Sequence, residues 1–299
     1  MIFKVLFALL FSYVSYAQTE EQEQQEQQAE EEVKFMTPQL SIVKKSIVKD
    51  KEPIEYAEIL EENALWVQVV WRRIDCRERM NYHLYYPTED LSTRRSLAQT
   101  LIDGIRAKKI QAYDDEEMQI PLSSAQVLKK LGAEDKEIIQ EKIDGSGDTV
   151  IHQKGYVKWN EVREFMLKEE WIIDKKHGRL DVRILGMCPI RVYKKDMSGG
   201  SEESSVESEL RNALFWVYFP EARRVLANTI CYNGKNQIAN LSFDDVFHKR
   251  YFSSYIEKMS NEINDREIRE YTRNGLEALL ESERIKRFLL ETESDLWSY

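Results

Sequence analysis

The sequence predicts an α+β fold that is rich in helices and contains short antiparallel strands and hairpins. Within residues 97–105, Leu97, Leu101 and Ile105 recur at the spacing of one helix face. In residues 179–184, charged and apolar side chains alternate with the period of a half-buried strand. Hydrophobic residues make up 42% of the chain, which is enough for one sizeable core or two small ones.

The first seventeen residues have the composition of a secretory signal peptide. Lys4 gives a positive start, and an apolar run follows over residues 5–14. Small residues then precede a cleavage site between Ala17 and Gln18. Ten apolar residues are too few to cross a bilayer as a helix, which makes a membrane anchor the weaker interpretation. We therefore predict that residues 1–17 are removed and that the mature chain is exported.

Charge is unevenly distributed along the 299 residues. The formal net charge is −10, but seven Glu lie within residues 18–32. With these and the positive Lys4 set aside, the remaining chain carries only −4. An acidic chain is repelled by nucleic acids and anionic membranes, so neither is an expected partner. We expect residues 18–53 to be a Glu/Gln-rich disordered spacer followed by a loose extended segment, with the folded part beginning at Ile54.

Capping and turn residues divide the first half of the folded part into helices. Asn63 can cap a helix over residues 63–81, in which apolar side chains recur at helical spacing. These side chains are Trp66, Val70 and Ile74. The other expected elements are a helix from Ser92 or Thr93 to Ile105, a helix from Ser123 to Gly132, a loop at Asp144–Asp148, and a helix that carries Trp159, Val162, Phe165 and Met166.

The second half alternates strands with helices. The first expected elements are a strand at Trp171–Ile173, a turn at His177–Gly178, and a strand from Leu180 that Gly186 and Pro189 interrupt before it resumes at Ile190–Tyr193. A strand at Ala213–Phe219 follows, then a short helix with Pro220 in its first turn and a hairpin turn at Asn233–Gly234. Ser242 caps the next helix, which is expected to continue through Phe247 and Tyr251 to Met259. The Gly/Ser/Glu-rich stretch 197–209 either divides two lobes or decorates one. In a last helix over Gly275–Glu291, the leucines of 276–280 do not line up with the apolar residues of 285–289. We therefore expect a break near Ser282.

Three cysteines are too few for a disulfide scaffold, but an oxidising compartment would allow one bridge. Cys188 and Cys231 are the preferred pair, because both fall in strand-like stretches that sheet pairing could bring together. The alternative, in which Cys76, Cys188 and Cys231 are all unpaired and buried, is equally open.

Complete catalytic and metal-binding patterns do not occur in the sequence. The four histidines lie far apart, and Asp144–Asp148 lacks the terminal Glu of a calcium loop. The pairs Ser41–Lys44 and Ser46–Lys49 match the first motif of penicillin-binding proteins, but the partner motifs are missing. We therefore expect no catalytic residues, no metal and no cofactor.

An aromatic pair at the C-terminus is the candidate contact surface. Trp297 and Tyr299 follow the acidic run 291–295 and have no obvious local core. Such residues are enriched at protein interfaces, although they can equally dock on their own domain. The sequence therefore proposes Trp297 and Tyr299 as partner contacts.

Four stretches of the chain together resemble one protein family. They are residues 66–87, which contain NYHLYYP, residues 171–192 around LGMCPI, residues 214–223 (LFWVYFPEAR), and residues 241–254, which begin LSFDDVF. These blocks resemble the gliding-motility and type IX secretion proteins called GldN and PorN. The resemblance covers about Ile54 to the C-terminus, so 54–299 is expected to be a GldN/PorN-like domain.

The resemblance implies a non-enzymatic structural subunit in the periplasm. Members of the family form a ring with an outer-membrane lipoprotein of the GldK or PorK type, and they contact the inner-membrane motor protein GldM or PorM. Such a chain self-associates within the ring and is held at the inner face of the outer membrane by its partners, without direct membrane insertion. Two alternatives stay open: a periplasmic enzyme that acts on cell-wall material, and a module that binds peptide or glycan.

Overall fold

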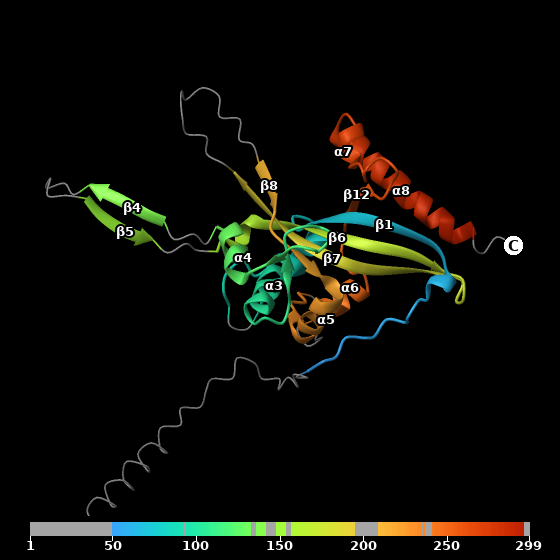
Figure 1. Ribbon diagram of the computed structural model, residues 1–299, viewed down its shortest axis with the longest axis horizontal. Helices are drawn as coiled ribbons and strands as arrows, with labels where there is room; N and C mark the ends of the chain where they lie inside the picture. The colour runs from blue at the N-terminus through green and yellow to red at the C-terminus, as the bar shows by residue number, and fades with distance from the viewer. Residues whose placement is uncertain are drawn as a thin grey trace, which may run out of the picture. The chain divides into compact units, whose positions relative to one another are not determined.

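The structure is a computed structural model that describes residues 50–91, 94–132, 136–141, 148–153, 157–194, 209–234, 236 and 241–295 (Figure 1). The strands are β1 (Ala64–Asp75), β2 (Ala112–Tyr113), β3 (Pro121–Leu122), β4 (Lys136–Glu141), β5 (Asp148–Gln153), β6 (Val162–Asp174), β7 (Arg179–Lys194), β8 (Glu209–Ala213), β9 (Trp216–Tyr218), β10 (Ile230–Cys231), β11 (Leu241–Ser242) and β12 (Tyr255–Met259). The helices are α2 (Tyr82–Tyr85), α3 (Leu97–Arg106), α4 (Ser124–Lys130), α5 (Phe219–Asn228), α6 (Phe243–His248), α7 (Ile268–Tyr271) and α8 (Gly275–Asp295). Short 3-10 turns at Glu61–Asn63, Arg79–Asn81 and Trp159–Glu161 precede β1, α2 and β6.

One antiparallel sheet organises the described residues. Its strand order is β12-β1-β6-β7-β9-β2-β3, and β8 also pairs with β7. The pairs β4–β5 and β10–β11 form two small separate sheets. All of these pairings are antiparallel, which confirms the predicted α+β class. The three central strands β1, β6 and β7 are longer than the short strands expected, with 12, 13 and 16 residues.

Three helices begin with the same capping arrangement. Ser96, Ser123 and Ser242 each accept a hydrogen bond from the backbone three residues later, and the side chain at that later position returns a contact to the serine backbone N–H. This capping box satisfies backbone groups that a helix start leaves free. It confirms the predicted starts at Ser123 and Ser242 and moves the start of α3 to Ser96, after the expected position. Gly132 follows α4 with a φ of 84°, as a left-handed helix end requires.

Buried apolar side chains form three clusters on the sheet. The first joins α3, α5 and α6 to Ile74, and the second joins α8 to Val70. Side chains alternate along a strand, so Val70 and Ile74, four residues apart on β1, lie on the same face. Trp71, Cys188 and Trp216 form the third cluster on the other face. The sheet is therefore covered on both faces along its middle.

Two predicted helices are wrong, because both stretches are central strands. Residues 63–81 contain β1, and the stretch around Trp159 and Met166 leads into β6. Along β1, Trp66, Val70 and Ile74 are spaced by four residues, which fits one face of a strand as well as one face of a helix. Consecutive residues in the second half of β1 are buried, so both faces of the strand are covered there. Such a strand lacks the alternation of apolar and polar residues by which a half-exposed strand is recognised.

Two predicted boundaries also differ from the structure. β7 continues through Gly186 and Pro189, and the irregularity appears as a register shift opposite Lys168–Glu169. A Cβ on Gly186 would lie 3.2 Å from the Trp216 ring, so glycine permits this close approach. α6 ends at His248, and the remainder of the helix predicted up to Met259 is a turn followed by β12.

The remaining elements agree with the predictions in kind. β6 and β7 form an antiparallel hairpin through a turn in which Gly178 has a φ of 59°. β10 and β11 pair as a hairpin, but their connection spans residues 232–240 and is not a two-residue turn at Asn233–Gly234. Residues 144–147 of the loop expected at Asp144–Asp148 lie outside the described residues. The same is true of residues 197–208 of the stretch 197–209.

Candidate interaction surface

Helix α8 lies along β12, the end strand of the sheet (Figure 1). Its residues Ile285 and Leu289 are buried in the second cluster. Ser282 is also buried, and its hydroxyl oxygen accepts a hydrogen bond of 2.9 Å from the backbone N–H of Ile256 in β12. Helix α8 therefore covers an edge strand that would otherwise be open to pairing with another chain.

The break predicted near Ser282 is wrong, because α8 is one helix from Gly275 to Asp295. Its apolar residues fail to line up because they belong to two different faces. At about 100° per residue, Leu276 and Leu280 project on the side opposite the buried Ile285. The exposed apolar residues of α8 are Leu276, Leu279, Leu280, Phe288 and Leu290. We call Leu276, Leu279, Leu280 and Leu290 the leucine face.

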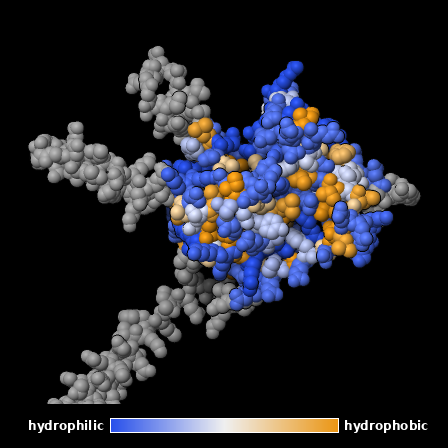
Figure 2. All heavy atoms as spheres, in the orientation of Figure 1, coloured by the Kyte–Doolittle hydropathy of each residue, from blue (hydrophilic) through white to orange (hydrophobic). Residues whose placement is uncertain are grey.

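The leucine face is uncovered in the described part of the chain. Leu276, Leu280 and Leu290 expose 67%, 62% and 53% of their surfaces. In Figure 2, apolar side chains lie at the surface among hydrophilic ones. Some of them lie in the region that α7 and α8 occupy in Figure 1. Exposed apolar residues that share one helix face are typical of a site for another protein.

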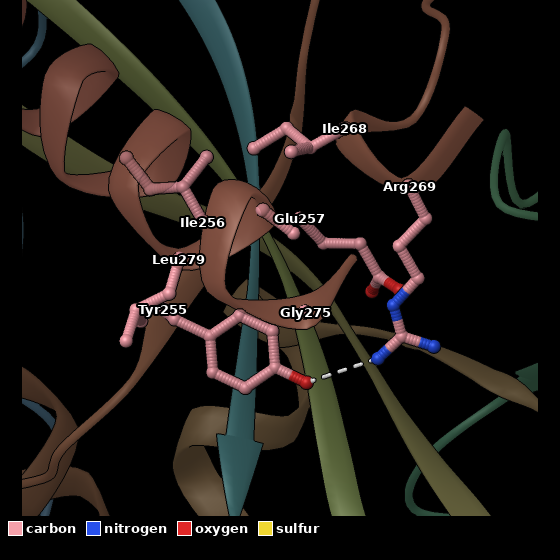
Figure 3. A pocket seen from close by; sticks show the side chains of 8 residues that line it. Tyr255, Ile256, Glu257, Ile268, Arg269, Gly275 and Leu279 are labelled. Atoms are coloured by element: carbon pink, nitrogen blue, oxygen red, sulfur yellow. Dashed lines mark hydrogen bonds between the residues drawn. The ribbon is translucent and has the colours of Figure 1, made fainter. Parts of the chain in front are cut away.

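A hollow of about 270 Å³ lies beside the leucine face, between β12, α7 and α8 (Figure 3). Ile268 and Leu279 contribute apolar walls. On its polar side Arg269 donates a hydrogen bond of 3.5 Å to the hydroxyl of Tyr255, whose pKa is raised by burial. The hollow is smaller than common small-molecule sites and better suits apolar side chains of a protein partner.

A buried charge cluster includes Glu257, which also lines this hollow. Arg73 donates to Glu257 at 2.8 Å and to Glu164 at 2.9 Å, and Arg211 donates to the other oxygen of Glu164 at 3.1 Å. The four residues come from β1, β12, β6 and β8, so the cluster ties four strands together. Burial raises the pKa of Glu257, although the Arg73 charge opposes this. The carboxylates are fully engaged with guanidinium groups, which is typical of a structural cluster.

A second surface carries exposed tyrosines after β1. Tyr82 and Tyr86 are 45% and 48% exposed, and their rings meet edge to face with centroids 5.7 Å apart. Tyr85 packs on Tyr86 at 4.9 Å and donates its hydroxyl to the backbone oxygen of Asn160. We call Tyr82, Tyr86 and the neighbouring exposed Met80 the tyrosine surface. Rigid aromatic side chains of this kind are common anchors in protein interfaces.

Both surfaces suit a protein that acts by binding other proteins. Residues 59–298 match the family described as gliding motility associated protein GldN. The chain belongs to the GldN family. The matched range contains all four stretches on which the resemblance rests, and membership makes the chain a gliding-motility and type IX secretion component. No curated protein matches the chain.

Residues before β1 lie in extended form against this GldN domain. The backbone N–H of Lys51 donates to Asn228 in α5 at 2.7 Å, and its ammonium pairs with Asp245 in α6 at 2.6 Å. The Tyr56 ring lies between the guanidinium groups of Arg183 and Arg223, each 4.1 Å from its centroid. These contacts hold the segment from Lys51 to Tyr56 against α5, α6 and β7.

Most of the site residues predicted for this GldN-family chain lie outside the described residues. These are Ala17 and Gln18 at the cleavage site, and Trp297 and Tyr299 at the C-terminus. The leucine face was missed because α8 was expected to break. Its signal was present, since Leu276, Leu280 and Leu290 share one helix face.

The predicted Cys188–Cys231 disulfide is not formed in the structure. Cys76, Cys188 and Cys231 are free and buried. Cys188 lies in the third cluster with the tryptophans, whereas Cys231 lies in the first cluster and faces the backbone oxygen of His83. Different faces of the sheet therefore hold the two thiols apart.

The described residues contain no group of three or more His, Cys, Asp or Glu side chains arranged to hold a metal ion. Among the described helices, none combines the length and the apolar composition needed to cross a bilayer.

Proposed function

We propose that the chain is a non-enzymatic periplasmic subunit of the type IX secretion and gliding machinery. In this role it forms a ring-like scaffold with an outer-membrane lipoprotein of the GldK or PorK type and contacts the inner-membrane motor of the GldM or PorM type. Its partners hold it at the inner face of the outer membrane. The predicted signal peptide over residues 1–17 supports export to this compartment.

The observation that carries this proposal is the pair of exposed surfaces on one domain. A scaffold subunit needs at least two separate contact sites, one for its own copies and one for a different protein. The leucine face lies on α8 at one end of the sheet order, and the tyrosine surface lies on the segment that follows β1. Together they could serve two partners at once.

Co-expression with the lipoprotein tests the proposal. A tagged mature chain and a lipoprotein of the GldK type are purified together from envelope extracts and imaged by electron microscopy. We expect co-purification in large ring-shaped particles. A Tyr82→Ser/Tyr86→Ser variant should lose lipoprotein while keeping its melting temperature, and Tyr218→Ser, at another exposed tyrosine, is the matched control.

Two results would contradict the proposal. The first is a mature chain that stays alone in envelope extracts and forms no particles with the lipoprotein. The second is hydrolysis of cell-wall material by the purified chain that disappears in Ser46→Ala, which would favour the enzyme alternative. A rise in melting temperature with a free peptide or glycan, without assembly, would favour a binding module.

A further inference from the structure

The exposed side of α8 has the spacing of a coiled-coil seam. Leu276, Leu280, Glu283, Arg287 and Leu290 follow one another at intervals of four, three, four and three residues. These intervals define the a and d positions of a heptad, which lie in one stripe along a helix. The stripe runs from Leu276 to Leu290, a rise of about 21 Å along the helix.

This seam is independent of the packing that holds α8 on its own domain. The buried residues Ser282, Ile285 and Leu289 lie on the other side of the helix. The seam leucines expose more than half of their surfaces, and Glu283 is 56% exposed. Because α8 is already folded against β12, a partner helix would not have to supply the free energy of forming it.

Two opposite charges lie in the middle of the seam. Glu283 has one exposed ion pair, with Lys286 at 3.5 Å, and Arg287 has no ion-pair partner among the described residues. In a parallel pair of identical helices, each seam residue meets its own copy, so Glu283 would face Glu283 and Arg287 would face Arg287. Such like-charge contacts disfavour the parallel arrangement.

An antiparallel pair of the same helices matches the four seam positions from Leu280 to Leu290, while Leu276 faces Ser294 of the other copy. With a two-fold axis at the level of residue 285, Leu280 meets Leu290 of the other copy at both ends. Glu283 then meets Arg287, and the reciprocal contact gives two ion pairs at the centre. The four positions from Leu280 to Leu290 are therefore complementary to themselves in the antiparallel orientation.

We propose that α8 pairs with α8 of a second copy of this chain as an antiparallel, two-stranded coiled coil. The contact is isologous, so it joins two subunits and cannot by itself close a ring. It specifies one self-association contact of the scaffold and to that extent rests on the function proposed above. Two heptads make a short interface, so we expect concentration-dependent dimers that multiple contacts in an assembly reinforce.

Charge reversal tests the pairing in the mature full chain. Sedimentation velocity over a concentration series should show wild-type dimers and at least a tenfold weaker association for Glu283→Arg or Arg287→Glu. The double variant Glu283→Arg/Arg287→Glu should recover the dimer, because the opposite charges again face each other. Glu291→Arg lies beside the seam and is the control for a change in net charge.

Disulfide trapping tests the orientation. A Leu280→Cys chain mixed with a Leu290→Cys chain, each with a tag of different mass, should give a cross-linked heterodimer under mild oxidation. Each variant alone should give none, because the two copies of one new thiol lie about 15 Å apart along the axis. Wild-type chain controls for the three buried native cysteines.

Specific results would overturn the pairing. These are a wild-type chain that stays monomeric at the highest concentration, charge variants that associate as well as wild type, or a Leu280→Cys chain that cross-links to itself. If one of these results is found and the wild-type chain still forms particles with the lipoprotein, the antiparallel pair is refuted and the scaffold function stands. If dimers form but no lipoprotein binds, the scaffold function is refuted instead.

Discussion

The hydroxyl of Ser282 in α8 and the backbone N–H of Ile256 in β12 form a hydrogen bond of 2.9 Å. β12 is the end strand of the main sheet, and strands at an edge carry backbone groups without a neighbouring strand. One buried serine thus joins a helix to the sheet edge, and it leaves the opposite side of α8 free for contacts with other proteins.

Replacing this serine should loosen the helix from the sheet. In Ser282→Ala the Ile256 N–H stays buried without an acceptor, which should lower the free energy of unfolding by about 1–2 kcal/mol. Urea denaturation followed by circular dichroism measures the change. Ser294→Ala, on the exposed part of the same helix, should stay within about 0.5 kcal/mol of wild type. Equal effects of the two substitutions would show that the hydrogen bond contributes nothing.

The buried charge cluster should be far more sensitive than surface ion pairs. Arg73→Met leaves Glu257 buried without its guanidinium partner, and breaking a buried pair of this kind costs about 3–5 kcal/mol. Arg77→Met is the matched control, because Arg77 is mostly exposed and its pair with Asp75 should contribute about 0–1 kcal/mol. Thermal unfolding of both variants provides the comparison.

The Arg73→Met variant should also respond to pH in a defined direction. Burial raises the pKa of Glu257, and loss of the opposing Arg73 charge should raise it further. A carboxyl group with a raised pKa in the folded state stabilises the fold below its ordinary pKa and loses this contribution as pH rises through the folded value. The variant should therefore be more stable near pH 5 than near pH 8, relative to wild type. The opposite trend would contradict the assigned cause.

Local signals in the sequence predicted some parts of the fold well. Ser123 and Ser242 were recognisable as caps because a capping box depends only on residues three positions apart. The strand β1 was not recognisable in this way. Its pattern of Trp66, Val70 and Ile74 fits two periods, and the choice between them depends on the strands β6 and β12 that pair with it from more than 90 residues away.

The candidate surface was predictable in part for a related reason. The leucines of α8 were visible in the sequence, but the sequence alone does not say which helix face the domain buries. A continuous helix with two apolar faces and a broken helix with one face give similar patterns. The buried Ser282 decides between them, and a polar residue at a core position is not expected from hydrophobicity.

The three cysteines should behave as inert thiols in the folded protein. Burial raises the pKa of Cys188 and of Cys231 to about 12 and also raises that of Cys76. Thiolates are therefore scarce at neutral pH, and iodoacetamide should leave the native chain unmodified. In guanidinium without reductant, mass spectrometry should find three added alkyl groups. A single added group would instead support the Cys188–Cys231 disulfide.

The contact between Lys51 and Asp245 should stabilise the extended segment before β1 only above a defined pH. Burial would raise the pKa of Asp245, but hydrogen bonds from Lys51 and Ser242 hold it at about 2, below its ordinary value. A lowered pKa contributes stability above the ordinary value near 4 and loses it as pH falls through 2. Lys51→Met should therefore destabilise the domain by at most about 1 kcal/mol at neutral pH, because Lys51 is partly exposed.

The pH dependence separates this ion pair from a loss of packing. The difference in stability between wild type and Lys51→Met should be constant well above pH 4 and shrink as pH falls toward 2. It should approach zero only below pH 2, where Asp245 becomes neutral in both chains. An NMR titration of the Asp245 carboxyl should show a higher pKa in the variant. Lys109→Met removes an exposed charge elsewhere and should change neither quantity. A difference that persists unchanged at pH 2 would mean that the lysine acts through its aliphatic chain.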